Sequence, residues 1–186
     1  MEVISLIKES AAGNRLAMNQ LFDLVYDDLK QLSRKIRLNW RNEHTLNTTA
    51  LVHEAYLKVQ NTDALSAQNK LHFYRICGQA MKYILQDHLK QKSTQKKGSG
   101  QRHLEISNDE VVNLSDDTLD LMEDIFHNIE KLQEHDPVVY EVIECRFFAD
   151  MSVKETSELL SISPATVKRK WSFAKAYISS ELKKTA

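Results

Sequence analysis

Three consecutive cations near the C-terminus, Lys168, Arg169 and Lys170, follow the small residues Ala165 and Thr166. Lys and Arg side chains bind phosphate oxygens and guanine edges, and small neighbours let a helix approach the DNA major groove closely. A basic helix face taken alone is more often a solvated surface. Whether these residues can bind DNA therefore depends on the elements that carry them.

Two capped helices are predicted around these cations. Ser152 and Glu155 have the spacing of a capping box, which predicts a helix over residues 153–160. A three-residue turn over 161–163 follows, and its last residue, a serine, caps a second helix. That helix has Pro164 at its first position, where a missing N–H costs nothing. Two capped helices joined by a short turn are the layout of a helix-turn-helix unit.

The two faces of the second helix are predicted from its periodicity. Val167, Trp171 and Ala174 recur at steps of four and three residues and should face the core. The outer face then carries Ala165, Thr166, Lys168, Arg169, Lys170 and Ser172. The caps, the turn length and the basic outer face together favour a helix that reads DNA.

The fold as a whole is predicted to be all-α. The 186 residues include only 4 Gly and 2 Pro, and apolar residues recur at helical spacing with little β-type alternation. In the first half, this spacing predicts helices over residues 14–38, 48–60 and 70–95. These helices are enough for one small helical domain.

Charge is segregated along the chain, although the formal net charge is only −1. Cations dominate residues 82–102, and acidic residues dominate residues 104–136. Charges act over roughly 8–10 Å at moderate salt, so a basic patch can attract a polyanion even in a nearly neutral chain. A DNA-binding role is therefore compatible with the overall charge balance.

The acidic stretch, headed by KKGSGQ, is predicted to be a flexible linker. The chain would then consist of two small helical domains, residues 1–96 and residues 119–186, joined by an acidic linker over residues 97–118. A plain solvated acidic surface is the alternative interpretation of this stretch.

Cysteine usage and hydropathy indicate a reducing compartment. Cys77 and Cys145 lie far apart within apolar helical patterns, which predicts buried, reduced thiols rather than a disulfide or a metal site. No apolar run approaches the roughly 20 residues of a membrane span, and the N-terminus lacks the pattern of a signal peptide. We therefore expect no membrane insertion and a cytoplasmic location.

An enzyme is the least favoured class. His53 with Glu54, His72, and Asp87 with His88 are the groups that acid–base or metal chemistry would use. Adjacent residues on one helix point about 100° apart rather than converging. The sequence has no HExxH motif, nucleophile elbow or glycine-rich phosphate loop. We expect no catalytic residues, no bound metal and no cofactor.

Three segments resemble the extracytoplasmic-function (ECF) sigma factors of bacterial RNA polymerase. They are ALVHEAYLKV, HFYRICGQAMKYILQDHLKQ and ECRFFADMSVKETSELLSISPATVKRKW, and they occur in the order that the family shows. The resemblance extends from about Ser5 to Leu182. It implies a sigma region 2 domain in residues 1–96 and a region 4 helix-turn-helix domain in residues 119–186. The implied function is to bind core RNA polymerase and direct promoter-specific transcription initiation.

The resemblance also implies three sets of contact residues. Polymerase would be bound by Leu51, Val52, His53, Glu54 and Tyr56. The minus-ten promoter element, which is melted to single strands, would be bound by Asn61, Asp63, Asn69, Lys82, Gln86, His88 and Lys90. The duplex minus-35 element would be bound by Ser163, Ala165, Thr166, Lys168, Arg169 and Lys170. The partners are then core polymerase and promoter DNA, and the resemblance also allows an anti-sigma factor or other regulator.

The sequence departs from the family pattern at a few positions. Many relatives carry an acidic residue and Gln where this chain has Ala50 and His53, which changes the charge that would face polymerase. Ser161 replaces the usual turn glycine, so a left-handed residue there would be mildly strained. Phe73, Tyr74 and Tyr83 are candidates for stacking on an unpaired base, with core packing favoured for Phe73.

The main alternative is a stand-alone helix-turn-helix regulator. Its N-terminal helices would then serve as a sensor or a dimer interface, and it would not bind polymerase. Co-purification with core polymerase discriminates between the two interpretations.

Overall fold

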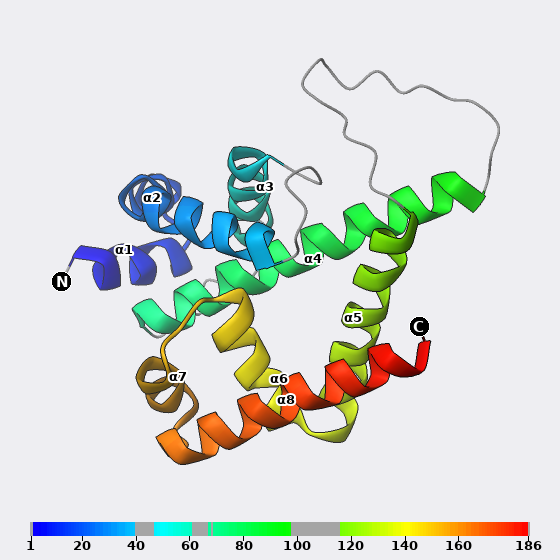
Figure 1. Ribbon diagram of the computed structural model, residues 1–186. Helices are drawn as coiled ribbons and strands as arrows, with labels where there is room; N and C mark the ends of the chain where they lie inside the picture. The colour runs from blue at the N-terminus through cyan, green and yellow to red at the C-terminus, as the bar shows by residue number, and fades with distance from the viewer. Residues whose placement is uncertain (1, 40–46, 61–66, 68, 98–115, 186) are drawn as a thin grey trace.

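The computed structural model describes residues 2–39, 47–60, 67, 69–97 and 116–185 (Figure 1). The described chain is helical and contains no strand, which confirms the all-α prediction. Its elements are α1 (Glu2–Ala11), α2 (Arg15–Asn39), α3 (Thr48–Gln60), α4 (Lys70–Lys97), α5 (Asp116–His135), α6 (Pro137–Ile143), the π-helical segment η2 (Glu144–Phe148), α7 (Val153–Leu160) and α8 (Pro164–Thr185).

Asparagine caps begin three of the helices in the first half. The Oδ1 atoms of Asn14, Asn47 and Asn69 each accept a hydrogen bond from a backbone N–H in the first turn of α2, α3 and α4, respectively. Such a cap satisfies one of the donors that a helix start leaves unpaired. The apolar faces of these helices then pack together, and Leu21 and Leu51 are among the fully buried residues.

The predicted helix-turn-helix is present in the second half. Ser152 and Glu155 form both bonds of the capping box, and α7 ends at Ser161, which has left-handed φ and ψ of 54° and 37°. The N–H of Thr166 then donates to Ser163 Oγ at 3.1 Å, which caps α8. Val167 and Ala174 of α8 are fully buried, as the periodicity predicts.

The two halves of the described chain share one hydrophobic core. Helix α4 crosses the molecule between α1–α3 on one side and α5, α6 and η2 on the other (Figure 1). One cluster of buried residues includes Phe73 and Met81 of α4, Phe126 of α5 and Phe148 of η2. The predicted linker, residues 97–118, falls almost wholly outside the described residues, so the division into two domains stays a prediction.

Close backbone packing accompanies this shared core. A Cβ atom added at Gly78 of α4 would lie 2.5 Å from the carbonyl oxygen of Phe148, so only glycine permits this approach. The rings of Phe126 and Phe148 stack beside it with centroids 6.3 Å apart. Helix α4 therefore packs both against α1–α3 and against the second half of the chain, from α5 onward.

Cys77 and Cys145 are buried free thiols, as predicted, and burial raises the pKa of Cys145 to about 12. No described helix combines the length and hydrophobicity that a bilayer crossing requires.

Candidate nucleic-acid interface

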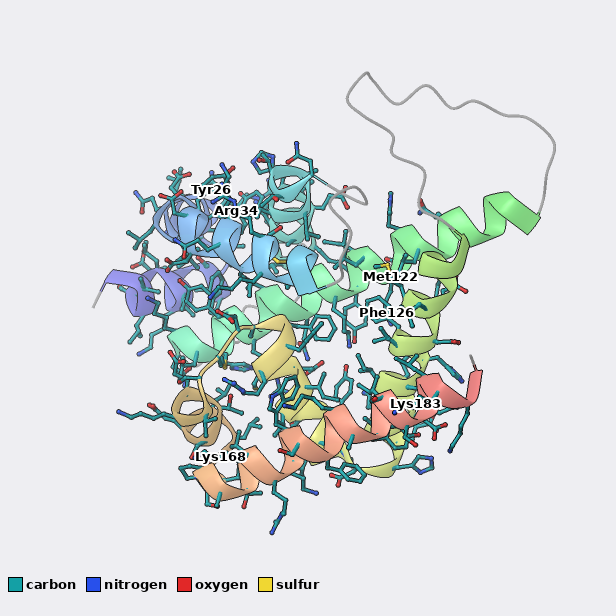
Figure 2. The ribbon with its side chains drawn as sticks, in the orientation of Figure 1. Tyr26, Arg34, Met122, Phe126, Lys168 and Lys183 are labelled. Atoms are coloured by element: carbon teal, nitrogen blue, oxygen red, sulfur yellow. The ribbon has the colours of Figure 1, made fainter. Side chains whose placement is uncertain are left out.

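The N-terminal turns of α8 present part of the predicted reading surface to solvent. Ala165, Lys168 and Arg169 are exposed, and Figure 2 shows Lys168 at the start of α8, on the outside of the molecule. Ser163 is exposed but is engaged as the cap, and the Thr166 hydroxyl lies 2.9 Å from Ser163 Oγ. The Ser163 cap and the buried side chains of Val167 and Ala174 hold this part of α8 in place.

Lys170 differs from its two basic neighbours because it is paired inside the protein. Its Nζ donates to Asp136 Oδ2 at 2.5 Å, and the two side chains are 25% and 31% exposed. Asp136 also caps α6 by accepting from the N–H of Val139. The hydrogen bond from Lys170 is the main cause that lowers the pKa of Asp136. Lys170 therefore fastens α8 to the start of α6.

Two predicted minus-ten residues on α4 are covered by the second half. Lys82 and Gln86 are only 2% and 6% exposed. The Nζ of Lys82 donates to the hydroxyl of Tyr140, and Nε2 of Gln86 donates to Glu130 Oε1 at 3.0 Å. In this arrangement both side chains serve the packing of the two halves.

The remaining predicted minus-ten residues lie in several environments. Asn69 is exposed and caps α4, His88 is partly buried, and Lys90 is exposed beside the groove between α4 and α5. Asn61 and Asp63 lie outside the described residues. The structure thus groups Lys82, Gln86 and Lys90 along α4.

A buried acidic residue lies at the centre of the α4 contact. Glu144 of η2 is almost fully buried, and its Oε2 accepts from Arg75 Nη2 at 2.9 Å and from Gln79 Nε2 at 2.6 Å. Its Oε1 lies 3.6 Å from Lys82 Nζ. Burial lowers the pKa of Lys82, although the Glu144 charge opposes that shift. Burial also lowers the pKa of Arg75, but the charge and hydrogen bonds of Glu144 outweigh it, so the net shift is upward.

Sequence reasoning missed Arg75, Gln79 and Glu144 as interacting groups. A signal was present, because Arg75, Gln79, Lys82 and Gln86 recur at steps of four, three and four residues, which is one face of a helix. Local spacing could not show which groups would pack against this face of α4.

Helix α3 divides the predicted polymerase residues between its two faces. Leu51 and Val52 are fully buried, and His53 and Glu54 are exposed. Tyr56 is partly buried, with its ring edge against Phe22 at a centroid distance of 4.3 Å and its hydroxyl donating to Asn19. His53 and Glu54 are therefore the two of the five that a partner can reach fully.

The three candidate stacking aromatics also differ in exposure. Phe73 is fully buried, as favoured above, and the hydroxyl of Tyr74 donates to Asp28 of α2. Tyr83 is 44% exposed, and the Nζ of Lys82 lies 4.5 Å from its ring centroid. Tyr83 is the most accessible of the three.

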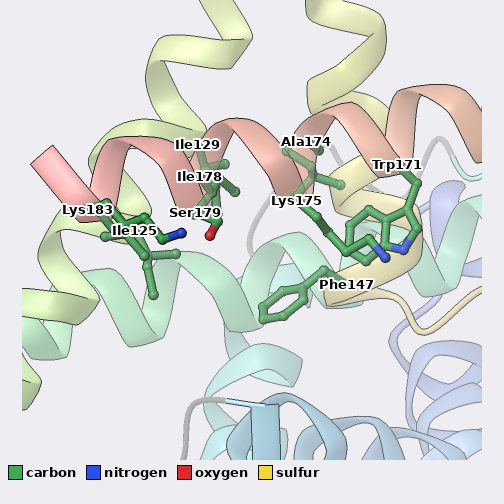
Figure 3. A pocket seen from close by; sticks show the side chains of 11 residues that line it. Ile125, Ile129, Phe147, Trp171, Ala174, Lys175, Ile178, Ser179 and Lys183 are labelled. Carbon is green, nitrogen blue, oxygen red and sulfur yellow. The ribbon is translucent and has the colours of Figure 1, made fainter.

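An apolar groove in the second half was not predicted. It has a volume of about 490 Å³ and lies between α5, α6, η2 and α8. Figure 3 shows Ile125 with Lys183 at one end and Phe147 with Trp171 at the other. Apolar grooves of this size accept side chains or helices of partners.

The comparison with protein families decides between the interpretations of the sequence. A family model described as ECF sigma factor matches residues 1–184. The chain belongs to the ECF sigma factor family. Comparison with curated proteins gives no match for this chain.

Membership gives this sigma factor its general function. It is an RNA polymerase sigma factor, with core RNA polymerase and promoter DNA as the partners that the family implies. A stand-alone regulator is not favoured, and ECF sigma factors are not an enzyme family. Among the residues that the structure describes, no three His, Cys, Asp or Glu side chains gather as metal ligands.

Proposed function

We propose that this ECF sigma factor divides its contacts among three surfaces. Lys168 and Arg169 of α8, with Ala165 beside them, contact the minus-35 duplex. His53 and Glu54 of α3 contact core polymerase, and α4 with the preceding loop binds the melted minus-ten element. The observation that carries the proposal is the exposed basic turn of α8, held by the Ser163 cap and by buried Val167.

The minus-35 contact is supported by the chemistry of α8. Arg169 has the planar, forked donor that binds a guanine edge or a phosphate with two bonds, and Lys168 binds phosphate as a point charge. Ala165 leaves room for a base pair. Lys170, assigned to DNA from the sequence, is instead proposed to position α8, because Asp136 holds its ammonium group.

Two weak DNA contacts are proposed to work as one. A single reading helix makes few phosphate contacts, so its own affinity is low. When polymerase holds residues 1–96 and residues 119–186 together, binding of one element raises the effective concentration of the other. Because polymerase and promoter DNA are the partners, we propose that the protein acts in the cytoplasm. A regulatory partner, such as an anti-sigma factor, stays a prediction.

Reconstituted transcription tests the division of contacts. The chain is combined with core RNA polymerase on genomic DNA, and the 5′ ends of the transcripts are sequenced. Lys168→Ala with Arg169→Ala should abolish promoter-specific initiation yet leave co-purification with core polymerase intact. His53→Ala with Glu54→Ala should weaken co-purification with core polymerase about tenfold or more, and initiation should fall with it.

The two double variants serve as controls for each other. Both remove exposed side chains, so both should keep the wild-type circular dichroism spectrum. The proposed division would be contradicted if the α8 variant lost polymerase binding. It would also be contradicted if both variants kept full activity.

A further inference from the structure

One face of α4 carries a row of hydrogen-bond donors whose acceptors lie in the second half of the chain, from α5 onward. Arg75, Gln79, Lys82 and Gln86 share this face, since they are spaced by four, three and four residues. Their acceptors all come from the second half: Glu144 for the first three, Tyr140 also for Lys82, and Glu130 for Gln86.

The groups that fill this face resemble the parts of a nucleic acid strand. Oε2 of Glu144 accepts from both Nε and Nη2 of Arg75, at 3.2 and 2.9 Å, and a phosphate oxygen can accept the same charge-assisted hydrogen bonds. The aromatic ring of Tyr140 lies beside Glu144, with its centroid 4.7 Å from Lys82 Nζ. Surfaces that bind single strands offer cations to the phosphates and to the faces of the bases, so Glu144 and Tyr140 occupy positions that a phosphate and a base could take.

We propose that the second half of the chain is an internal competitor for the face of α4 that binds the melted promoter strand. Glu144 stands in the place of a backbone phosphate, and Tyr140 stands in the place of a base. This inference rests on the proposed role of α4 in minus-ten binding, and it adds Arg75 and Gln79 to that surface. The closed chain then binds a melted strand only after the two halves separate.

The contact is built so that it can be exchanged for another anion. Buried ion pairs add little net stability, because removing both charges from water costs about as much as their attraction returns. Glu144 Oε1 has no hydrogen-bond partner among the described residues, and its nearest cation is Lys82 at 3.6 Å. A phosphate with more acceptor oxygens can satisfy Arg75, Gln79 and Lys82 at least as well.

A charge-neutral substitution of Glu144 tests the competition. Full-length wild-type chain and Glu144→Gln are titrated against a fluorescent oligodeoxythymidine at low salt, and anisotropy is measured. Minor conformers are commonly about 0.1–10% populated, so releasing the closed form should tighten binding about tenfold or more. Glu134→Gln is the matched control, because it removes the same charge from an exposed site on α5. Equal binding by the two variants, both folded by circular dichroism, would overturn the proposal.

A cleavable tether gives a second test that does not depend on Glu144→Gln folding. Lys35 and Asp150 form an exposed ion pair between α2 and the second half, with side chains 55% and 47% exposed. Lys35→Cys with Asp150→Cys are bridged by a bis-maleimide that contains a disulfide, while Cys77 and Cys145 are buried. The tethered chain should not bind the oligonucleotide or initiate transcription with core polymerase, and cleavage of the tether should restore both activities.

The outcomes separate this inference from the proposed function. If the untethered wild-type chain directs initiation and the tethered chain does so equally well, the internal competition is wrong and the proposed function stands. If the untethered chain directs no promoter-specific initiation with core polymerase, the proposed function itself fails.

Discussion

At the scale of single residues, neighbours in the sequence have different tasks in the structure. Lys168 and Arg169 point to solvent from α8, whereas Lys170 pairs with Asp136 at the cap of α6. An exposed cation is available for a phosphate, but a paired one would first have to leave its carboxylate. The basic triplet therefore offers two solvent-exposed cations and one that is paired within the protein.

The pairing of Lys170 with Asp136 predicts a pH-dependent contribution to stability. Asp136→Asn keeps an N-cap but loses the charge, so it should lower the free energy of unfolding by about 0.2–1 kcal/mol at pH 7. The pKa of Asp136 is lowered below its ordinary 3.8. Its contribution is therefore full above that value and is lost as the pH falls through the folded-state pKa. Urea unfolding of both proteins at pH 7 and pH 5 should give the same difference, and the difference should shrink below pH 3.8.

The left-handed residue at the end of α7 gives a prediction of the opposite sign. Ser161 has φ of 54°, a conformation that costs a non-glycine residue about 1 kcal/mol or more. Ser161→Gly should therefore stabilise the protein, by about 0.5 kcal/mol after the entropy of glycine is subtracted. Ser172→Gly, at an exposed position within α8, should instead destabilise it by about 0.5 kcal/mol. Equal effects in thermal unfolding would show that the Ser161 conformation is not strained.

At the scale of elements, α4 combines two sets of contacts on one helix. Its inner residues complete the core with α1–α3, and its polar stripe and Gly78 meet α5, α6 and η2. Helix propensity alone disfavours glycine in the middle of a helix. Gly78 is instead explained by the approach of the η2 backbone, which leaves no room for a side chain.

This approach predicts that a better helix former will destabilise the protein. Gly78→Ala should gain about 1 kcal/mol from helix propensity, but its Cβ would lie 2.5 Å from the carbonyl oxygen of Phe148. We expect a net loss of about 1–3 kcal/mol, because the backbone must move or the halves must part. Urea unfolding measures this loss. A more stable Gly78→Ala variant would mean that α4 and η2 do not pack this closely in solution.

At the scale of the whole molecule, the positions of the charges matter more than their sum. The formal net charge is −1, yet basic residues face outward on α8 while acidic Glu144 and Glu130 pair with the donors of α4. The cations on α8 are open to solvent, and the internal pairs link the two halves. A nearly neutral chain can in this way serve a polyanionic partner.

This arrangement predicts a steep salt dependence for promoter binding. Each neutralised phosphate contributes a slope of about −0.9 to the plot of log affinity against log salt concentration. Holoenzyme with Lys168→Ala and Arg169→Ala should therefore have a slope smaller by about two than the wild type. Electrophoretic mobility shift assays on promoter duplex across a salt series measure both slopes. Identical slopes would contradict phosphate contact by these two residues.

The sequence by itself determined helices α2, α3, α4, α7 and α8, the caps at Ser152 and Ser163, the buried face of α8 and the resemblance to the family. These features depend on residues three or four positions apart, which local spacing reveals. Only the tertiary structure decided that Lys170 is paired and that Lys82 and Gln86 are covered. Their partners lie 34, 58 and 44 positions away, respectively, and face them only after α4 packs between the two halves.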